Sequence, residues 1–543
     1  MMTVRRMTAI LLAAIGLWSV NAARAEEVHL DFDTGMVSRF EPRNLNGSSY
    51  GRVELQTNRF CEGINGGRAL DLSSRAAVRI PLLLENAVNY DESFSVALYV
   101  KTLPEAAQGT AIAGNCRYEE AAGTPGWLIY AQENGAWAVR FSDGRKTYFY
   151  RPTARQAIND GRFHQLAFSV DYANECVRFY RDGVCRAIYR TPDLGSLAAG
   201  RTVIGGSADQ EYFGQEYAFN GMLDEVRLCQ QPLTDAAMRI EFETCFPDRA
   251  AAEPRNRTGR LRLLEWNIWS AGKNFGRKVG LERTIEILRA ADPDIVGLVE
   301  TYGHGAELAD ALDCQLYLIG DNLSILSRYP IEQVIRIYDP VLSGGAIIRL
   351  DDKRKIAVFD LWLHYLPDYL GSITGGEKKT AAELIRDEEP TRHAEIKQIL
   401  AELEPFLAGA DTVPVIMMGD FNGGSHLDWT TDNTAPHQGY AVEWPVSKTM
   451  QQHELVDSYR LLNPNIHTSP GATWSPWMIP GRYDVDRQTL PDRVDYIYFK
   501  GALLRPLHSQ VIDYHPVMFP SDHAALLTDF AWVETAEPEG GAQ

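Results

Sequence analysis

The pattern of hydrophobic residues changes once along this chain of 543 residues, close to its middle. From Glu27 to about Cys245, apolar and polar residues alternate in short runs separated by turns, which is typical of β-strands. Asp182-Gly183 between two such runs predicts a tight hairpin, and Thr234–Glu243 has the clearest helical pattern in this half. A β-sandwich or jelly roll is therefore predicted. The expected strands are Val28–Phe32, Ala76–Ile80, Phe94–Val100, Gly126–Ala131, Trp137–Phe141, Phe163–Val170, Val177–Tyr180 and Leu223–Leu228.

The second half mixes strands with helices. Phe246–Arg260 is polar, contains two prolines and has no apolar period, so it is predicted to be a linker. Beyond it, an α/β domain of stacked layers is expected over 261–535, after a jelly roll over 27–245. The expected strands include Leu261–Trp266, Ile295–Val299, Ile356–Leu363 and Val413–Met418, and the expected helices are Val279–Ala290, Gly305–Leu312 and Thr391–Leu407.

The first 25 residues have the pattern of a secretory signal. Arg5 and Arg6 precede an apolar run, and Ala23-Arg24-Ala25 forms a cleavage site before Glu26. A membrane anchor is the alternative, but the run is shorter than the roughly 20 residues that a span needs. We expect cleavage after Ala25 and a secreted or periplasmic protein with no transmembrane segment after cleavage.

Export affects how the cysteines and the charge are interpreted. Six of the seven cysteines lie in the first half, where disulfide bonds are expected, and Cys314 is expected to be a buried free thiol. The formal net charge of −19 argues against a protein that coats nucleic acid electrostatically. It does not exclude an enzyme that uses a divalent cation to attract a phosphate.

Several segments of the first half resemble the laminin-G/concanavalin A-like jelly roll. They are Val28–Asp33, Phe163–Ala167, Phe179–Gly183 and Gly221–Arg227. The resemblance implies an accessory domain that could bind a glycan or calcium. Asp224-Glu225 lies near the end of this domain, and a structural role for this pair is as good an interpretation as ligand binding.

Polar residues follow the apolar strands of the second half one after another. A single polar residue in such a place is usually a turn or cap residue, but seven positions in one domain suggest a shared site. Carboxylates, amides and histidines at these positions suit metal-assisted hydrolysis of a phosphate ester. The positions are Asn267, Glu300, His364, Asp420 with Asn422, Asp495, and Asp522 with His523.

The order of three motifs resembles the endonuclease/exonuclease/phosphatase superfamily. These motifs are Gly419-Asp-Phe-Asn422, Arg493-Val-Asp-Tyr496 and Ser521-Asp-His523. The resemblance implies a four-layer sandwich with two central sheets covered by helices. Some family members carry an acidic residue two positions after the first Asn, where this chain has Trp269. A second metal at that end is therefore weakly supported, and an aromatic wall for the substrate is the alternative.

The resemblance also implies a role for each residue. Glu300 is expected to hold Mg²⁺, with Mn²⁺ or Ca²⁺ as alternatives, and Asn267 to act as metal ligand or phosphate contact. His523 is expected to be the general base, oriented by Asp495. The remaining residues are expected to position the attacking water and the phosphate (Asp420 and Asn422), to stabilise the developing charge (His364), and to hold a second metal or bias the charge of the site (Asp522). Apart from the resemblance, Trp474 could stack on a base or sugar of the substrate, with a buried core position as the alternative.

These features predict a metal-dependent phosphoric ester hydrolase. Its substrate is a nucleic acid, a lipid head group or a small molecule, and the nuclease and the lipid or small-molecule phosphodiesterase remain close rivals. The segment Tyr365–Glu389 is expected to be a mobile loop over the site. The alternative from another class is a non-catalytic, glycan-binding adhesin with an inert second domain.

Overall fold

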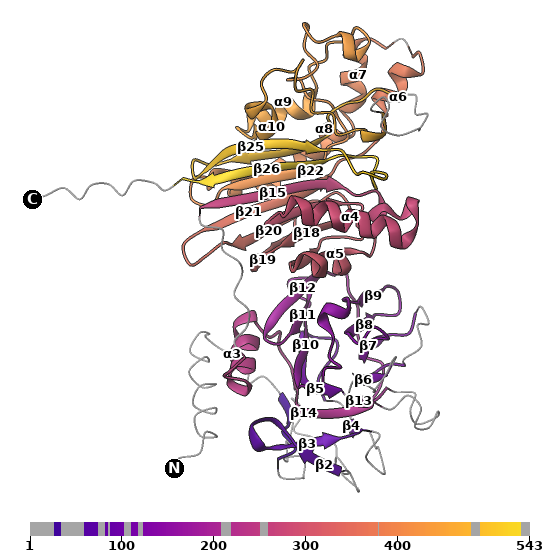
Figure 1. Cartoon of the computed structure of the whole chain (residues 1–543), viewed down its shortest axis with the longest axis vertical. Coiled ribbons are helices and arrows are strands. Elements are labelled where there is room, and N and C mark those ends of the chain that lie inside the picture. Colours follow the sequence, from indigo (N-terminus) through magenta and orange to yellow (C-terminus); the bar gives the residue numbers. More distant parts are fainter. Residues whose placement is uncertain are drawn as a thin grey trace, which may run out of the picture.

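The computed structural model describes residues 27–33, 59–73, 82–84, 87–102, 110–117, 123–207, 219–249, 259–377, 379–478 and 489–533. The expected signal segment, most of the expected linker and the strand expected over Ala76–Ile80 lie outside these residues. Figure 1 shows two domains stacked along the longest axis, the first half of the chain below and the second above. In the described part of the chain, no helix combines the length and hydropathy needed to cross a membrane.

The first domain is a sandwich of two antiparallel sheets, which confirms the predicted jelly-roll architecture. Phe94, Trp127 and Phe168 pack against one another in its core, with ring centroids 5.3–5.8 Å apart. One sheet contains β1 (Glu27–Leu30), β2 (Arg59–Glu62), β3 (Arg68–Asp71), β5 (Phe94–Thr102), β10 (His164–Asp171), β11 (Cys176–Arg181), β12 (Val184–Arg190) and β14 (Gly221–Cys229). The other contains β4 (Leu82–Leu84), β6 (Ala111–Gly114), β7 (Gly126–Ala131), β8 (Trp137–Ser142), β9 (Thr147–Tyr150) and β13 (Thr202–Ile204).

Two local predictions in this domain are confirmed. Asp182 and Gly183 both have positive φ, 51° and 76°, which is the backbone that a two-residue hairpin between β11 and β12 requires. The helix α3 (Asp235–Cys245) begins after Thr234, whose side chain accepts a hydrogen bond from the Ala237 amide.

The second domain has four layers, as its resemblance to the superfamily implied. Two sheets pack face to face through residues such as Ile325, Met418 and Leu526. Helices α4 (Arg277–Ala291) and α5 (Gly305–Leu312) cover the outer face of one sheet, and α8 (Arg392–Ala408) and α9 (Pro445–Gln452) cover the other. The first sheet contains β15 (Arg260–Asn267), β16 (Ile295–Val299), β17 (Gln315–Leu318), β18 (Leu323–Ser327), β25 (Leu504–Ile512) and β26 (Ala525–Trp532). The second contains β19 (Ile331–Ile335), β20 (Ser343–Arg349), β21 (Lys355–Trp362), β22 (Val415–Asp420), β23 (Val456–Asp457) and β24 (Asp495–Lys500), and the short α10 (Ser458–Leu462) follows β23.

The segment expected to be a mobile loop contains two short helices instead, α6 (Tyr369–Thr374) and α7 (Ala381–Glu388). A capping box starts α7, because the Thr380 and Glu383 side chains each accept a hydrogen bond from the other's backbone amide. Tyr369 of α6 and Leu384 of α7 pack with Trp429 in a separate apolar cluster. Packing of these apolar residues explains why much of the segment is helical where a loop was expected.

The two domains share one sheet. The edge strand of the first jelly-roll sheet, β12, runs parallel to β17, with Ala187 opposite Leu316 and Tyr189 opposite Leu318. Asp310 of α5 adds a second connection, because its carboxylate accepts hydrogen bonds at 2.6 Å from the Thr153 amide and from Gln156 Nε2. Residues of the first domain therefore lie directly beside β17 and α5 of the second domain.

The predicted disulfide bonds are absent, because all seven cysteines are free thiols. The strand register places other residues opposite them: Ala69 opposite Cys61, Arg190 opposite Cys176 and Tyr180 opposite Cys185. Cys314 is buried and free as predicted, and burial raises the pKa of its thiol to about 12.

Candidate active site

Strand pairing brings the polar strand ends of the second domain together. β22 ends at Asp420 and antiparallel β24 begins at Asp495, so these two residues are direct cross-strand partners. In the facing sheet, Asn267 ends β15 and is the parallel partner of Val299, the residue before Glu300. His523 lies just before β26, the other neighbour of β15. One edge of the sandwich thus gathers side chains from the ends of five strands, β15, β16, β22, β24 and β26.

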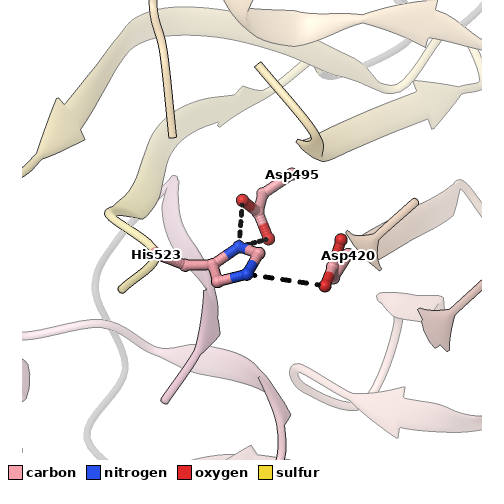
Figure 2. Close-up of side chains that lie close together, drawn as sticks. All are labelled: Asp420, Asp495 and His523. Atoms are coloured by element: carbon pink, nitrogen blue, oxygen red, sulfur yellow. Dashed lines mark hydrogen bonds and ion pairs between the residues drawn. The ribbon is translucent and has the colours of Figure 1, made fainter. Parts of the chain in front are cut away.

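Asp420, Asp495 and His523 form a buried cluster. Figure 2 shows the imidazole lying between the two carboxylates, with Nδ1 turned toward Asp495 and Nε2 toward Asp420. Nδ1 lies 2.9 Å from Asp495 Oδ2, and Nε2 lies 3.9 Å from Asp420 Oδ2. Asp495 therefore fixes the ring orientation, and Nε2 is the nitrogen that faces the remaining polar groups of the site.

The two carboxylates also control the proton on His523. Burial lowers the pKa of His523, but Asp495, Asp420 and Asp522 outweigh burial and raise the pKa to about 10. Burial raises the pKa of Asp420 to about 7 even though His523 opposes the rise. The net effect of these neighbours is to favour the imidazolium form of His523.

Asn267 joins this cluster to Glu300. Its Nδ2 donates to Asp420 Oδ2 at 3.1 Å and to Glu300 Oε1 at 3.3 Å, and its Oδ1 accepts from the Trp269 amide at 3.0 Å. The amide oxygen, which is the atom that would ligate a metal, thus faces the backbone. In this arrangement Asn267 holds two carboxylates in place.

Asn422 holds Asp420 from the other side. The Asn422 amide donates to Asp420 Oδ1 at 2.9 Å, and its Nδ2 donates to Asp420 Oδ2 at 3.1 Å and to the Leu363 carbonyl at 3.0 Å. Asp522 lies close enough to act on both neighbours, because its charge raises the pKa of Glu300 and of His523. The structure therefore brings together Asn267, Glu300, Asp420, Asn422, Asp495, Asp522 and His523.

Trp474 also lies at the cluster. Its ring meets the His523 ring edge to face, with centroids 5.0 Å apart, and its backbone pairs with Asp492. Half-buried Trp269, at the position where some family members have an acid, packs on Trp477 at 5.0 Å between centroids and on Phe275 at 6.0 Å.

His364 is placed differently. Its exposed ring stacks on Tyr365, and Nδ1 accepts from the Leu366 amide at 3.0 Å. Among the residues that the structure describes, no hydrogen bond or ion pair joins its side chain to Asp420 or His523. The position of His364 after a predicted strand was therefore not enough to predict which residues its side chain contacts.

Several supporting residues escaped the sequence analysis. Trp266 Nε1 donates to the His523 carbonyl at 2.8 Å, and the Ser521 hydroxyl donates to the Asn267 carbonyl at 2.6 Å. The Thr473 hydroxyl accepts from the amides of Val494 and Asp495 at 3.1 Å each. These bonds lock the loops before β24 and β26. In the sequence, Trp266 and Thr473 directly precede the candidate residues Asn267 and Trp474, and Ser521 begins one of the three motifs.

A buried ion network anchors the strand that carries Asp495. Arg493 binds Asp428 at 2.7 Å and Asp457 at 2.5 Å, and Arg460 binds the other oxygen of Asp428 at 2.8 Å. Asp492 accepts from Tyr369 Oη at 2.6 Å and from Trp429 Nε1 at 3.0 Å. Removing one member of such a network leaves a buried charge unpaired, so its residues act on the site by fixing the backbone.

Two further carboxyl groups lie behind the site. Glu265 and Asp360 are fully buried, and the Glu265 carboxyl has no hydrogen-bond partner within the described residues. Burial raises the pKa of both far above their ordinary values, and Asp495, Asp360 and Asp420 raise that of Glu265 further. A single acidic residue inside an apolar strand was the signal that could have pointed to them.

The residues present fit a divalent cation. Burial raises the pKa of the Glu300 carboxyl, and Asp522 raises it further, although His523 and Asn267 lower it. Hard carboxylate oxygens with excess negative charge are what Mg²⁺ and related ions prefer. The group formed by Asp420, Asp495 and His523 has its ligand atoms within 4.8 Å of one another, but both imidazole nitrogens face carboxylates. Glu300 and Asp522 are the better-suited ligands.

Two family models match separate parts of the chain. The sequence model of the endonuclease/exonuclease/phosphatase family matches residues 264–523, and that of the concanavalin A-like lectin/glucanases superfamily matches residues 74–238. An uncharacterized protein of Caenorhabditis elegans, F14F9.5, is 25% identical over 312 residues, which are 50% of this chain and 92% of that protein.

Three solved structures resemble about half of the chain. Truncated TDP2 from C. elegans is 17% identical and covers 51% of this chain with 100% of its own, with a TM-score of 0.35. The human Nocturnin catalytic domain with bound sulfate is 18% identical and covers 51% with 97% of its own, with a TM-score of 0.34. An AP endonuclease from Archaeoglobus fulgidus is 16% identical and covers 49% with 98% of its own, with a TM-score of 0.35. The two family matches and the strand-end site agree: the chain contains a domain of the endonuclease/exonuclease/phosphatase family, preceded by a laminin-G/concanavalin A-like jelly roll.

Proposed function

We propose that this protein is an exported, divalent-metal-dependent phosphodiesterase that cleaves its substrate by attack of water on phosphorus. One observation supports this proposal most strongly. Asp495 orients His523, whose free nitrogen faces Asp420, while Asn267 links Asp420 to Glu300. An oriented imidazole beside a group of hard carboxylates suits proton transfer and phosphate binding in one site.

Each residue has a defined task in this proposal. Asp495 holds the Nδ1 proton of His523, so Nε2 takes the proton of the attacking water. Asp420, fixed by Asn267 and Asn422, orients that water. Exposed His364 contacts the phosphate, and Trp474 packs on His523 and on the substrate. Glu300 and Asp522 would hold Mg²⁺, with Mn²⁺ or Ca²⁺ as alternatives, and a bound ion would supply positive charge opposite the phosphate.

The charge state of His523 is the constraint on this mechanism. A general base must be neutral, whereas the surrounding carboxylates raise the pKa of His523 to about 10. Positive charge bound at Glu300 opposes these carboxylates and lowers the pKa of the imidazole. The proposal therefore links metal dependence to base function.

A nuclease and a lipid or small-molecule phosphodiesterase remain the two candidate activities, and the jelly roll is proposed as an accessory domain that could bind a glycan. A glycan-binding adhesin would need none of the interactions around His523. The experiment is to incubate the full-length protein with Mg²⁺ and, separately, DNA, RNA, sphingomyelin and sugar phosphates. We expect the wild type to hydrolyse one of these classes, and His523→Ala to hydrolyse the same class at a rate at least about 10²-fold lower. Glycan binding without turnover of any substrate by the wild type would contradict the proposal.

A further inference from the structure

A small cleft lies where the two domains meet, beside the candidate active site. It has a volume of about 250 Å³. The jelly roll contributes Lys146, Tyr148 and Arg190 to its lining, and the second domain contributes Tyr302, Asp321 and Trp362. The parallel pairing of β12 with β17 fixes the two walls relative to each other, because Arg190 ends β12.

The cleft adjoins the residues proposed to bind the metal and the phosphate. Tyr302 follows Glu300 by two residues, and the amide of Thr301 between them donates at 3.0 Å to the carbonyl of Asn322, which also lines the cleft. Trp362 is the parallel partner of Asp420 across β21 and β22, so the two side chains point to the same face of the sheet. Trp362 packs on the core between the two sheets, the space toward which Asp420 also points. A substrate held at Asp420 can therefore extend into the cleft.

Arg190 is the strongest sign of an absent ligand. Its Nε and Nη1 are buried, and neither atom has a hydrogen-bond partner within the described residues. A guanidinium group is always charged, and a buried charge is costly unless an anion pairs with it. Lys146 adds a second cation: its ammonium lies 4.8 Å from the centroid of the Tyr148 ring. Its ion pair with Asp321 is 3.7 Å long and exposed on both sides, so it is weak.

Resting on the proposed phosphodiesterase function, we propose that this interdomain cleft binds the nucleoside phosphate adjacent to the scissile bond. Arg190 and Lys146 take its phosphate, and Tyr302 and Trp362 contact its ring. Aromatic side chains stack on bases without selecting among them, and arginine binds phosphate through two parallel hydrogen bonds. The jelly roll is then part of the substrate site.

The size of the cleft and the charge of the chain limit what it holds. Small-molecule sites usually span roughly 300–1,000 Å³, so a cleft of about 250 Å³ takes one ring with its phosphate. The net charge of −19 repels a long polyanion over most of the surface. Both observations favour a short oligonucleotide or nucleotide conjugate over duplex nucleic acid.

The test compares the binding of two probes, thymidine 3′,5′-bisphosphate and thymidine 5′-monophosphate. Their affinities are measured by calorimetry in the presence of Mg²⁺. The full-length protein carries His523→Ala, so that the probes are not consumed. We expect the bisphosphate to bind about tenfold more tightly, the factor for one hydrogen-bonded charged group. Adding Arg190→Gln should make the two affinities equal. Adding Lys146→Gln, at an exposed position, should reduce the preference and provides a second variant if Arg190→Gln fails to fold.

Arg186→Gln is the matched control. Arg186 lies on the same strand and at the same domain junction, but it pairs with Asp313 and lines a different cavity. This variant should keep the preference for the bisphosphate. Equal binding of the two probes by the parent protein would overturn the cleft assignment, as would an unchanged preference in a folded Arg190→Gln variant. Because binding needs no turnover, the preference can persist even if the phosphodiesterase proposal fails, and turnover without the preference would reject the cleft alone.

Discussion

Replacing His523 with alanine is expected to lower turnover by about 10²- to 10⁴-fold, the range for loss of a general acid–base group. Metal affinity should stay close to that of the wild type, because the imidazole nitrogens face Asp495 and Asp420 rather than Glu300. Asp495→Asn should give a similar loss, since it removes the carboxylate that orients the ring. The measurement is kcat on the substrate identified in the panel, together with Mg²⁺ affinity by calorimetry for each variant.

His515→Ala is the control for this experiment. His515 lies eight residues before His523 in the same segment, but its Nε2 contacts Glu286 at 3.1 Å. Its replacement should leave turnover near the wild-type value. A His523→Ala variant that is folded and nearly fully active would contradict the proposed base.

Replacing Glu300 with glutamine is expected to lower activity mainly through weaker metal binding. The substitution removes one negative charge from the proposed ligand group but keeps an oxygen in place, so raised Mg²⁺ should restore much of the rate. The measurement is the Mg²⁺ concentration that gives half-maximal rate, which should rise at least tenfold. Glu307→Gln, on α5 beside His304, should leave that concentration unchanged. A loss that saturating Mg²⁺ does not reverse would assign Glu300 to a step other than metal binding.

The strand ends of the site were predictable because each residue follows an apolar run. A strand ends at or just before each of three site residues, Asn267, Glu300 and Asp420. The ends of strands can be predicted from the sequence, because the apolar periodicity stops there. Their convergence depends on strand order and register, such as the pairing of Asp420 with Asp495. The order of motifs in a known superfamily supplied that information, and hydrophobic periodicity alone could not.

The contacts of the side chains were less predictable. Asn267 and Asn422 donate hydrogen bonds to Asp420, and this choice depends on local backbone geometry that the sequence does not reveal. The ion network of Arg493 joins Asp428 and Asp457, which are separated from it by 65 and 36 residues. Such partners can be identified only when the loops between the strands are placed.

The contact between the two domains could not be predicted for a related reason. Each half of the chain shows its own hydrophobic pattern, and the polar segment between them suggested two independent units. Nevertheless, β12 of the first domain pairs with β17 of the second. The hydrophobic pattern of a strand does not show whether its edge will form hydrogen bonds with a strand of another domain. The cleft at Arg190 follows from this pairing, so it too has no signature in the sequence.

The central claim is that a divalent cation and His523 together hydrolyse a phosphodiester. Its most direct test is the initial rate of hydrolysis by the wild type after chelation with EDTA and during stepwise return of Mg²⁺, with His523→Ala measured in parallel. The rate of the wild type should fall to background with EDTA and return with Mg²⁺, and His523→Ala should stay low at every concentration. A wild-type rate that EDTA does not change would contradict the claim, as would recovery of His523→Ala to the wild-type rate.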